Sequence, residues 1–155
     1  MLIESDKRGD KLSLAYSKMN FSVPKNLFII GMMNTADRSL ALIDYALRRR
    51  FAFYNVDPAF DNEQFKKYQE QVNSNLLNRL IDLIKVLNIE IEQDSSLGNG
   101  FKIGHSYFCN LESVDENEIK SIITYEISPL LEEYWFDDTE RFKTWINKLN
   151  GVING

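Results

Sequence analysis

The fold of this chain is decided by residues 26–39, which read NLFIIGMMNTADRS. The continuous apolar run over residues 27–33 predicts a strand buried on both faces, and Asn34 would leave its carboxyl end. That edge of an open α/β sheet is where nucleotides bind. The segment therefore predicts half of a nucleoside-triphosphatase site.

The residues that follow extend this strand into a β-α-β unit. Ser39 can cap a helix with one apolar face, and residues 51–54 predict the next strand. Three successive arginines, Arg48, Arg49 and Arg50, close the helix. A guanidinium suits phosphate, and an arginine offered to a neighbouring subunit's nucleotide can raise phosphoryl transfer by roughly 10³–10⁵. The unit thus carries a candidate arginine finger.

Two weaker patterns lie on either side of the unit. Residues 11–17 and 20–23 alternate apolar and polar side chains, which predicts a half-buried hairpin. Asp57 and Pro58 mark a boundary, because a proline disfavours helical geometry in the residue before it. We expect a different domain beyond that point.

The remainder of the chain predicts a bundle of roughly four helices. Apolar residues recur with helical spacing over residues 77–91, 119–131 and 142–149, and a short helix fits residues 63–71. A glycine-containing loop over residues 94–104 interrupts them. The spacing of apolar residues therefore changes from the alternation typical of strands to the spacing typical of helices.

Local signals sharpen the ends of these helices. Asp61 offers a cap, and Asp115 and Asp137 each stand three residues before a glutamate, as in a capping box. Pro129 should kink or end the middle helix, because it lacks a backbone N–H and its ring crowds the preceding turn.

Composition fits a soluble piece with one core, or one core and a small satellite: 155 residues, 44% of them hydrophobic. The net charge of -5 argues against direct nucleic-acid binding, which needs a basic surface. Cys109 is the single cysteine, which favours a reducing cytosol, and one cysteine with one histidine cannot build a tetrahedral zinc site. No apolar run approaches membrane-spanning length. We expect a cytoplasmic protein without a metal site or membrane segment.

Several stretches together resemble the McrB family of AAA+ GTPases, the motor subunits of modification-dependent restriction systems. The two most specific are MNTADRS at residues 33–39 and DYALRRRF at residues 44–51. The similarity also takes in MLIE at 1–4, DKRG at 6–9, GFKIGHSYFC at 100–109 and PLLEEY at 129–134. The resemblance therefore runs nearly from end to end.

The resemblance implies an α/β fold: the carboxyl-terminal part of an AAA+ αβα core at residues 1–57, and an α-helical lid subdomain at residues 58–155. No G-x-x-x-x-G-K-[ST] phosphate loop occurs in these residues. The family's strand of Mg²⁺-associated acidic residues would precede Met1, so we expect the chain to begin inside the helix after that strand.

Within the family, Asn34 would be sensor 1, a neutral group that hydrogen-bonds the γ-phosphate or the attacking water. Taken alone, an asparagine after a strand is usually a turn former. The arginines could merely offset a helix dipole, and three successive helical residues point about 100° apart, so they cannot all reach one phosphate. Resemblance favours Arg49 and Arg50 as fingers, with another arginine bracing Asp37 or Asp44.

The other candidate residues would lie near the nucleotide or at the subunit interface. Asp37 and Arg38 either face that interface or form a local ion pair, and Asp44 is either solvated or steers the arginines. Arg48 belongs to the same group. His105 and Ser106 resemble the lid segment near the nucleotide, although a lone histidine is more often an ordinary hydrogen-bonded residue.

The resemblance implies the sensor, arginine-finger and lid portion of an NTP-driven ring motor. Its cofactor would be GTP, or ATP, with Mg²⁺ in the parent assembly, and none for the chain alone. Its partners would be neighbouring AAA+ subunits and a McrC-like nuclease. Two other hypotheses stay open: a non-catalytic truncated interaction fragment, and part of an ATP-using MoxR-like chaperone.

Overall fold

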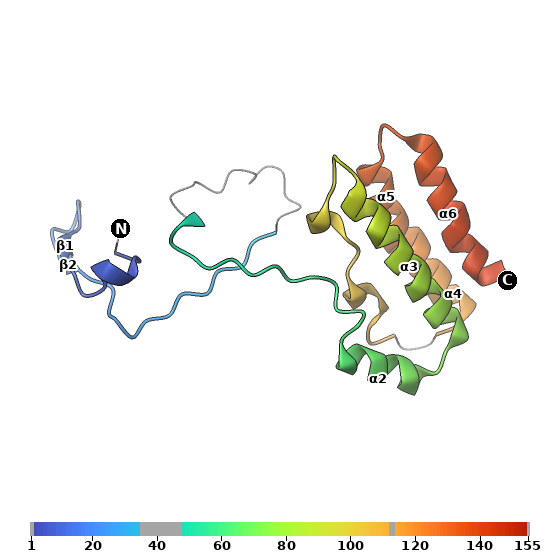
Figure 1. Cartoon of the computed structure of the whole chain (residues 1–155), viewed down its shortest axis with the longest axis horizontal. Helices are drawn as coiled ribbons and strands as arrows, with labels where there is room; N and C mark the ends of the chain where they lie inside the picture. The colour runs from blue at the N-terminus through green and yellow to red at the C-terminus, as the bar shows by residue number, and fades with distance from the viewer. Residues whose placement is uncertain (1, 35–47, 112–113, 155) are drawn as a thin grey trace. The chain divides into compact units, whose positions relative to one another are not determined.

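The computed structural model describes residues 2–34, 48–111 and 114–154, and the chain forms two compact units, Met1–Asn55 and Val56–Gly155. Figure 1 colours the first unit from blue to green-blue and the helices of the second from green to red. Each unit is described by itself below.

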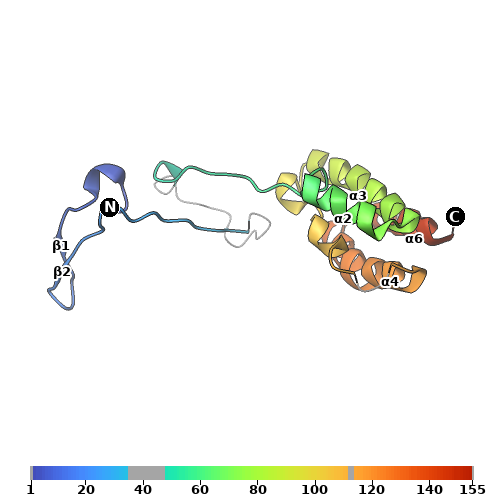
Figure 2. The same ribbon diagram turned by 90° about the horizontal axis from the view of Figure 1, so that it is seen from below.

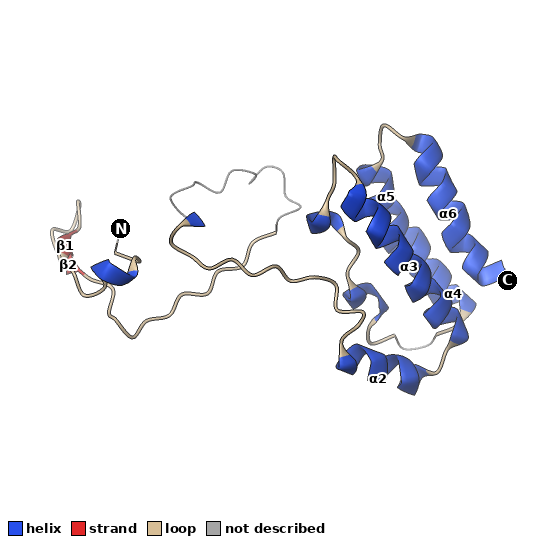
Figure 3. Cartoon of the chain, in the orientation of Figure 1, coloured by secondary structure: helices blue, strands red, loops and turns tan. Residues whose placement is uncertain are grey.

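The first unit contains a short hairpin, drawn in red in Figure 3. Strands β1 (Leu12–Ser13) and β2 (Asn20–Phe21) are antiparallel, with Leu12 opposite Phe21. A 3₁₀ turn, η1 (Ser5–Lys7), precedes them, and Gly9 donates its N–H to the carbonyl oxygen of Val23 at 2.8 Å. Gly9 does so at a φ of +91°, which favours glycine. The hairpin prediction is confirmed, although both strands are exposed rather than half-buried.

The two strands expected on either side of the arginine helix are not present. Residues 27–33 and 51–54 belong to no sheet, and Phe28 and Met32 are 89% and 98% exposed. A strand completes its hydrogen bonds only through neighbouring strands, and within the described ranges the sheet consists of β1 and β2 alone. The expected β-α-β unit is therefore wrong for residues 27–33 and 51–54, and residues 40–47 lie outside the described ranges.

The second unit is helical, as the spacing of its apolar residues predicts, whereas the expected domain bounds stay a prediction (Figure 3). Figures 1 and 2 show α3 running beside α6, and these two helices contact each other. Segments α4, η5 and α5 follow one another without a break, and η5 is a π-helical turn. Two 3₁₀ turns lie in the loop between α3 and α4. The elements in chain order are α2 (Glu63–Val72), α3 (Asn75–Gln93), η3 (Asn99–Phe101), η4 (His105–Phe108), α4 (Glu116–Ser121), η5 (Ile122–Ile127), α5 (Ser128–Tyr134) and α6 (Thr139–Asn154).

The helix starts follow the capping signals to within one residue. Asp115 accepts a hydrogen bond from the backbone N–H of Glu118 at 2.8 Å, which confirms that cap. Asn62 rather than Asp61 caps α2, and Asp138 rather than Asp137 accepts from the backbone N–H at the start of α6. The corrections arise because adjacent polar residues compete for one cap, and sequence alone does not rank them.

Pro129 does not end the middle helix, which was one of the two effects expected of it. It lies in the first turn of α5, and helical geometry continues through η5 from Ile122 to Ile127. A π turn is wider than an α turn, and we attribute its position to the ring of Pro129, which would otherwise crowd the carbonyl of the preceding turn.

The core of this unit is built around α3. Six aliphatic residues on one face of α3 have no solvent exposure: Leu77, Leu80, Ile81, Ile84, Leu87 and Ile91. Burying one such side chain stabilises the fold by about 1.5–3 kcal/mol. Helix propensities of ordinary residues differ by less than about 0.7 kcal/mol. Packing, rather than local preference, therefore fixes where α3 lies.

One polar residue, Asn88, is buried on α3 at 6% exposure. Its amide accepts from the backbone N–H of Ile103 at 2.6 Å and donates to the carbonyl of Ile103 at 2.9 Å. A side-chain amide thus pairs with both backbone groups of a buried residue, as a neighbouring strand would. This contact holds the loop before η4 against α3.

Replacing Asn88 with alanine should lower the free energy of unfolding by about 3 kcal/mol, because the N–H and carbonyl of Ile103 lose their partners while buried. Asn75→Ala, at an exposed position of the same helix, should change it by less than about 0.5 kcal/mol. Urea unfolding followed by circular dichroism measures both. Equal effects of the two variants would contradict this role of Asn88.

Candidate functional site

Asn34, the expected sensor, is exposed and lies just before the first gap in the described ranges. Asp37, Arg38 and Asp44 fall at positions 35–47, outside the described residues. The roles of these four residues therefore stay predictions.

The three arginines lie in different surroundings. Arg48 and Arg49 are exposed, whereas the side chain of Arg50 is only 12% exposed and forms an ion pair with Glu4. Arg50 Nε donates to Glu4 Oε1 at 2.5 Å. This hydrogen bond lowers the pKa of Glu4 below its ordinary value. The sequence predicts an acidic partner for one arginine at Asp37 or Asp44, and no local pattern points to Glu4, 46 residues away.

Glu4 and Arg50 line an open pocket of about 620 Å³ within the first unit. Arg8, Lys25, Arg49 and Asp6 also line it, so four cationic side chains accompany two carboxylates. Arg8 donates to the carbonyl oxygens of Ile3 at 3.1 Å and Leu27 at 3.0 Å. The pocket is suited to a phosphate-like anion, since guanidinium and ammonium groups offer donors and charge together.

His105 has a structural partner in the second unit. Its Nδ1 accepts a hydrogen bond from the backbone N–H of Ala59 at 3.1 Å. Its ring lies edge-on to Phe60 and Phe65, with ring centroids 6.2 and 5.6 Å away. Ser106 beside it is exposed. In this hydrogen bond the Nδ1 atom is the acceptor. The proximity of His105 and Ser106 to a nucleotide stays a prediction.

The segment that carries Ala59 is fastened to the helices at both ends. Asp57 accepts from Asn99 at 3.0 Å and pairs with Lys102 at 3.2 Å, and Asp61 pairs with Lys85 at 2.9 Å. Between them, Phe60 is 3% exposed and sits in the core. Residues 57–61 therefore belong to the helical unit.

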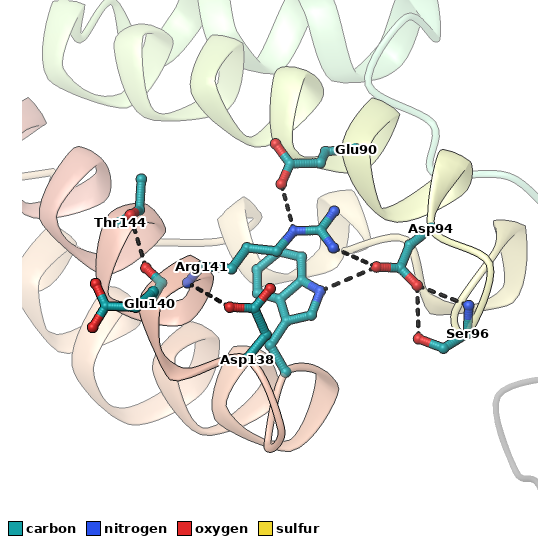
Figure 4. Close-up of polar contacts among 8 residues, drawn as sticks. Glu90, Asp94, Ser96, Asp138, Glu140, Arg141 and Thr144 are labelled. Carbon is teal, nitrogen blue, oxygen red and sulfur yellow. Dashed lines mark hydrogen bonds and ion pairs between the residues drawn. The ribbon is translucent and has the colours of Figure 1, made fainter.

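A charged cluster joins α3 to α6, and Figure 4 shows Arg141 between Glu90 and Asp94. Arg141 Nε lies 2.7 Å from Glu90 Oε1, and its Nη1 lies 2.5 Å from Asp94 Oδ2. The guanidinium carbon is 4.5 Å from the ring centroid of Trp135, whose indole N–H also donates to Asp94 at 3.4 Å. Asp94 further accepts from the hydroxyl and backbone N–H of Ser96. One side chain of α6 thus fixes the end of α3.

These hydrogen bonds strongly lower the pKa of Asp94, those from Ser96 first and those from Arg141 and Trp135 after them. Burial by itself would raise the pKa of Glu90, but hydrogen bonds from Trp145 and Arg141 outweigh it and lower that pKa too. Both carboxyl groups therefore favour the charged form in the folded state. No local sequence pattern singles out Glu90, Asp94 or Arg141.

Comparison with known proteins agrees with the helical unit. Residues 79–143 match the family described as the McrB α-helical lid domain. The chain is also 47% identical, over 97% of its length, to the type IV methyl-directed restriction enzyme EcoKMcrB subunit of Escherichia coli strain K12. The chain is McrB-like. It spans about a third, 36%, of the length of that curated relative.

The match to the McrB lid runs from the first turns of α3 to the start of α6. It includes Asn88 with Ile103, and Arg141 with Glu90 and Asp94, so these contacts are internal to the lid. Ala59, the partner of His105, lies before the matched residues. Asn34 and the arginines lie outside the lid family and inside the longer match to McrB, which supports a carboxyl-terminal McrB fragment.

Within the described ranges, no helix is long and apolar enough to cross a membrane. No group of three or more histidine, cysteine, aspartate or glutamate residues there could hold a metal ion.

Replacing His105 with alanine should release residues 57–61 from the lid. The backbone N–H of Ala59 loses its acceptor and Phe60 loses an aromatic neighbour, so the free energy of unfolding should fall by about 2 kcal/mol. Hydrogen exchange at the Ala59 amide should quicken, while Ser106→Ala, which removes an exposed hydroxyl, should leave it unchanged. An equally protected amide in His105→Ala would refute the fastening role.

The lid should lose stability on acidification. A lowered folded pKa means that the contribution of Asp94 is complete above the unfolded value of about 3.9 and is lost as pH falls through the folded value. Urea unfolding at a series of pH values should show a decline below about pH 4 that is shallower in Asp94→Asn. Asp82→Asn, an exposed carboxyl on α3, should keep the original slope. Identical slopes in both variants would be inconsistent with this assignment.

Proposed function

We propose that this chain supplies the sensor, arginine-finger and lid portion of a McrB-like AAA+ nucleotide hydrolase that uses GTP and drives a McrC-like nuclease in the restriction of modified DNA. The observation that carries the proposal is the 47% identity to a methyl-directed restriction subunit over 97% of the chain. The lid match at residues 79–143 supports it independently.

In the proposed chemistry, Asn34 and Arg49 of the first unit have different roles. Asn34 offers a neutral donor and acceptor, which can orient a water or the reacting phosphate without adding charge. Arg49 offers an exposed guanidinium beside a cationic pocket, as a finger reaching the nucleotide of a neighbouring subunit would need. Arg50, already paired with Glu4, is the less suitable finger.

The proposed cofactor is GTP, with ATP as the competing nucleotide, together with Mg²⁺ in the assembled motor. These 155 residues contain no G-x-x-x-x-G-K-[ST] sequence, so the phosphate loop would come from elsewhere in the parent protein. We expect neither tight nucleotide binding nor turnover from the chain by itself. Its proposed partners are adjacent copies of the motor subunit and the nuclease, in the cytoplasm.

Substitution of Asn34 and Arg49 in the intact subunit tests the proposal. Asn34→Ala and Arg49→Ala should each reduce GTP turnover by at least about 10²-fold while nucleotide affinity changes little, since both groups act on the reacting phosphate. Lys11→Ala, which removes an exposed cation of the hairpin, should leave turnover unchanged.

A mixing experiment tests whether the finger acts between subunits. Arg49→Ala subunits should recover part of their activity when mixed with subunits whose phosphate-loop lysine is replaced, because each supplies what the other lacks. If both variants assemble together and no activity returns, Arg49 is not a finger supplied to a neighbour.

A further inference from the structure

The ion pair between Glu4 and Arg50 distinguishes the three arginines. The two residues are 46 positions apart, both side chains are partly buried, and the pair is a direct charge-assisted hydrogen bond. Such a bond fixes the direction of a guanidinium more firmly than an exposed ion pair does. The backbone at position 50 is therefore held from the other end of the unit.

Arg49 is the next residue along the backbone, so its position depends on the same contact. It is exposed, and it lines the same pocket as Glu4 and Arg50, whereas Arg48 does not line that pocket. Among the residues of the described ranges, no hydrogen bond or ion pair holds the guanidinium of Arg49. Its charge is thus available for a ligand.

The segment that carries Glu4 is itself tied down. Arg8, at the end of η1, donates to the carbonyl oxygens of Ile3 and Leu27. Ile3 adjoins Glu4, and Leu27 begins the apolar run that leads to Asn34. Two side chains, Arg8 and Glu4, therefore connect the amino-terminal segment to both segments that carry proposed catalytic groups.

We infer that Glu4 is a positioning residue: by holding Arg50 it directs the neighbouring Arg49 toward the phosphate of the nucleotide on an adjacent subunit. This inference rests on the proposed function, because it takes Arg49 as the finger. Glu4 itself touches no substrate. Its effect on turnover passes entirely through the arginine segment.

The test uses the intact subunit and compares Glu4→Ala with Arg49→Ala. Glu4→Ala should lower turnover by about 10- to 100-fold, the range expected when a reacting group is misplaced by about 1 Å, with nucleotide affinity and assembly unchanged. When Glu4→Ala is added to Arg49→Ala, turnover should fall no further, because the two changes remove the same contact. The matched control is Asp10→Asn, an exposed carboxyl in the same amino-terminal stretch that does not line the pocket, and it should retain full turnover.

Mixing separates a positioning role from a merely structural one. Glu4→Ala subunits should be rescued by subunits lacking the phosphate-loop lysine, but not by Arg49→Ala subunits, since both would lack a working finger. The exchange Glu4→Arg with Arg50→Glu should restore turnover to within about tenfold of the original, because the pair is remade in reverse. Rescue of Glu4→Ala by Arg49→Ala subunits would overturn the inference.

The possible failures are distinguishable. Normal turnover in Arg49→Ala would overturn both assignments, that of Arg49 as the finger and that of Glu4 as the positioning residue. A defective Arg49→Ala with a fully active Glu4→Ala would overturn the positioning role alone and leave the proposed function standing. Glu4→Ala could instead lose nucleotide affinity or assembly, without recovery in the charge exchange. That result would show that Glu4 only maintains the fold, and it would also overturn the positioning role.

Discussion

The lid depends on one constraint, the burial of a single aliphatic face of α3. Six residues of that face have no solvent exposure, and the buried residues of α4, η5, α5 and α6 belong to the same core cluster. Polar contacts then fix details that burial leaves free. Asn88 sets the path of the loop before η4, and Arg141 fixes α6 against the end of α3. Both contacts depend on α3 being anchored by its apolar face.

The first unit follows a different physical rule. Residues 27–33 are as apolar as the buried face of α3, yet they remain outside any sheet. A helix satisfies its backbone hydrogen bonds within itself, whereas a strand needs a neighbouring strand. The same degree of hydrophobicity therefore gives a packed core in one unit and exposed side chains such as Phe28 and Met32 in the other.

Charge pairing divides the candidate residues in a way that residue type does not. Arg49 and Arg50 are chemically identical neighbours that line the same pocket, but Arg50 is held in an ion pair with Glu4, whereas Arg49 is exposed. In the lid, His105 is likewise engaged by the backbone of Ala59. The role of an aromatic or cationic side chain near a proposed site is therefore better inferred from its bonding partners than from its residue type.

The sequence by itself predicted the helical lid and the hairpin, because helical periodicity, capping and turn residues are local signals. Its resemblance to McrB supplied the relationship that the comparison confirms. It also located Asn34 and the arginines as candidates. Only the tertiary structure decided which acid at the start of α6 acts as its cap, that Pro129 is accommodated by a π turn, and that Glu4 and Asp94 pair with Arg50 and Arg141. These pairings join residues 46 and 47 positions apart. Contacts over such separations depend on how the packed elements meet, which no local pattern encodes.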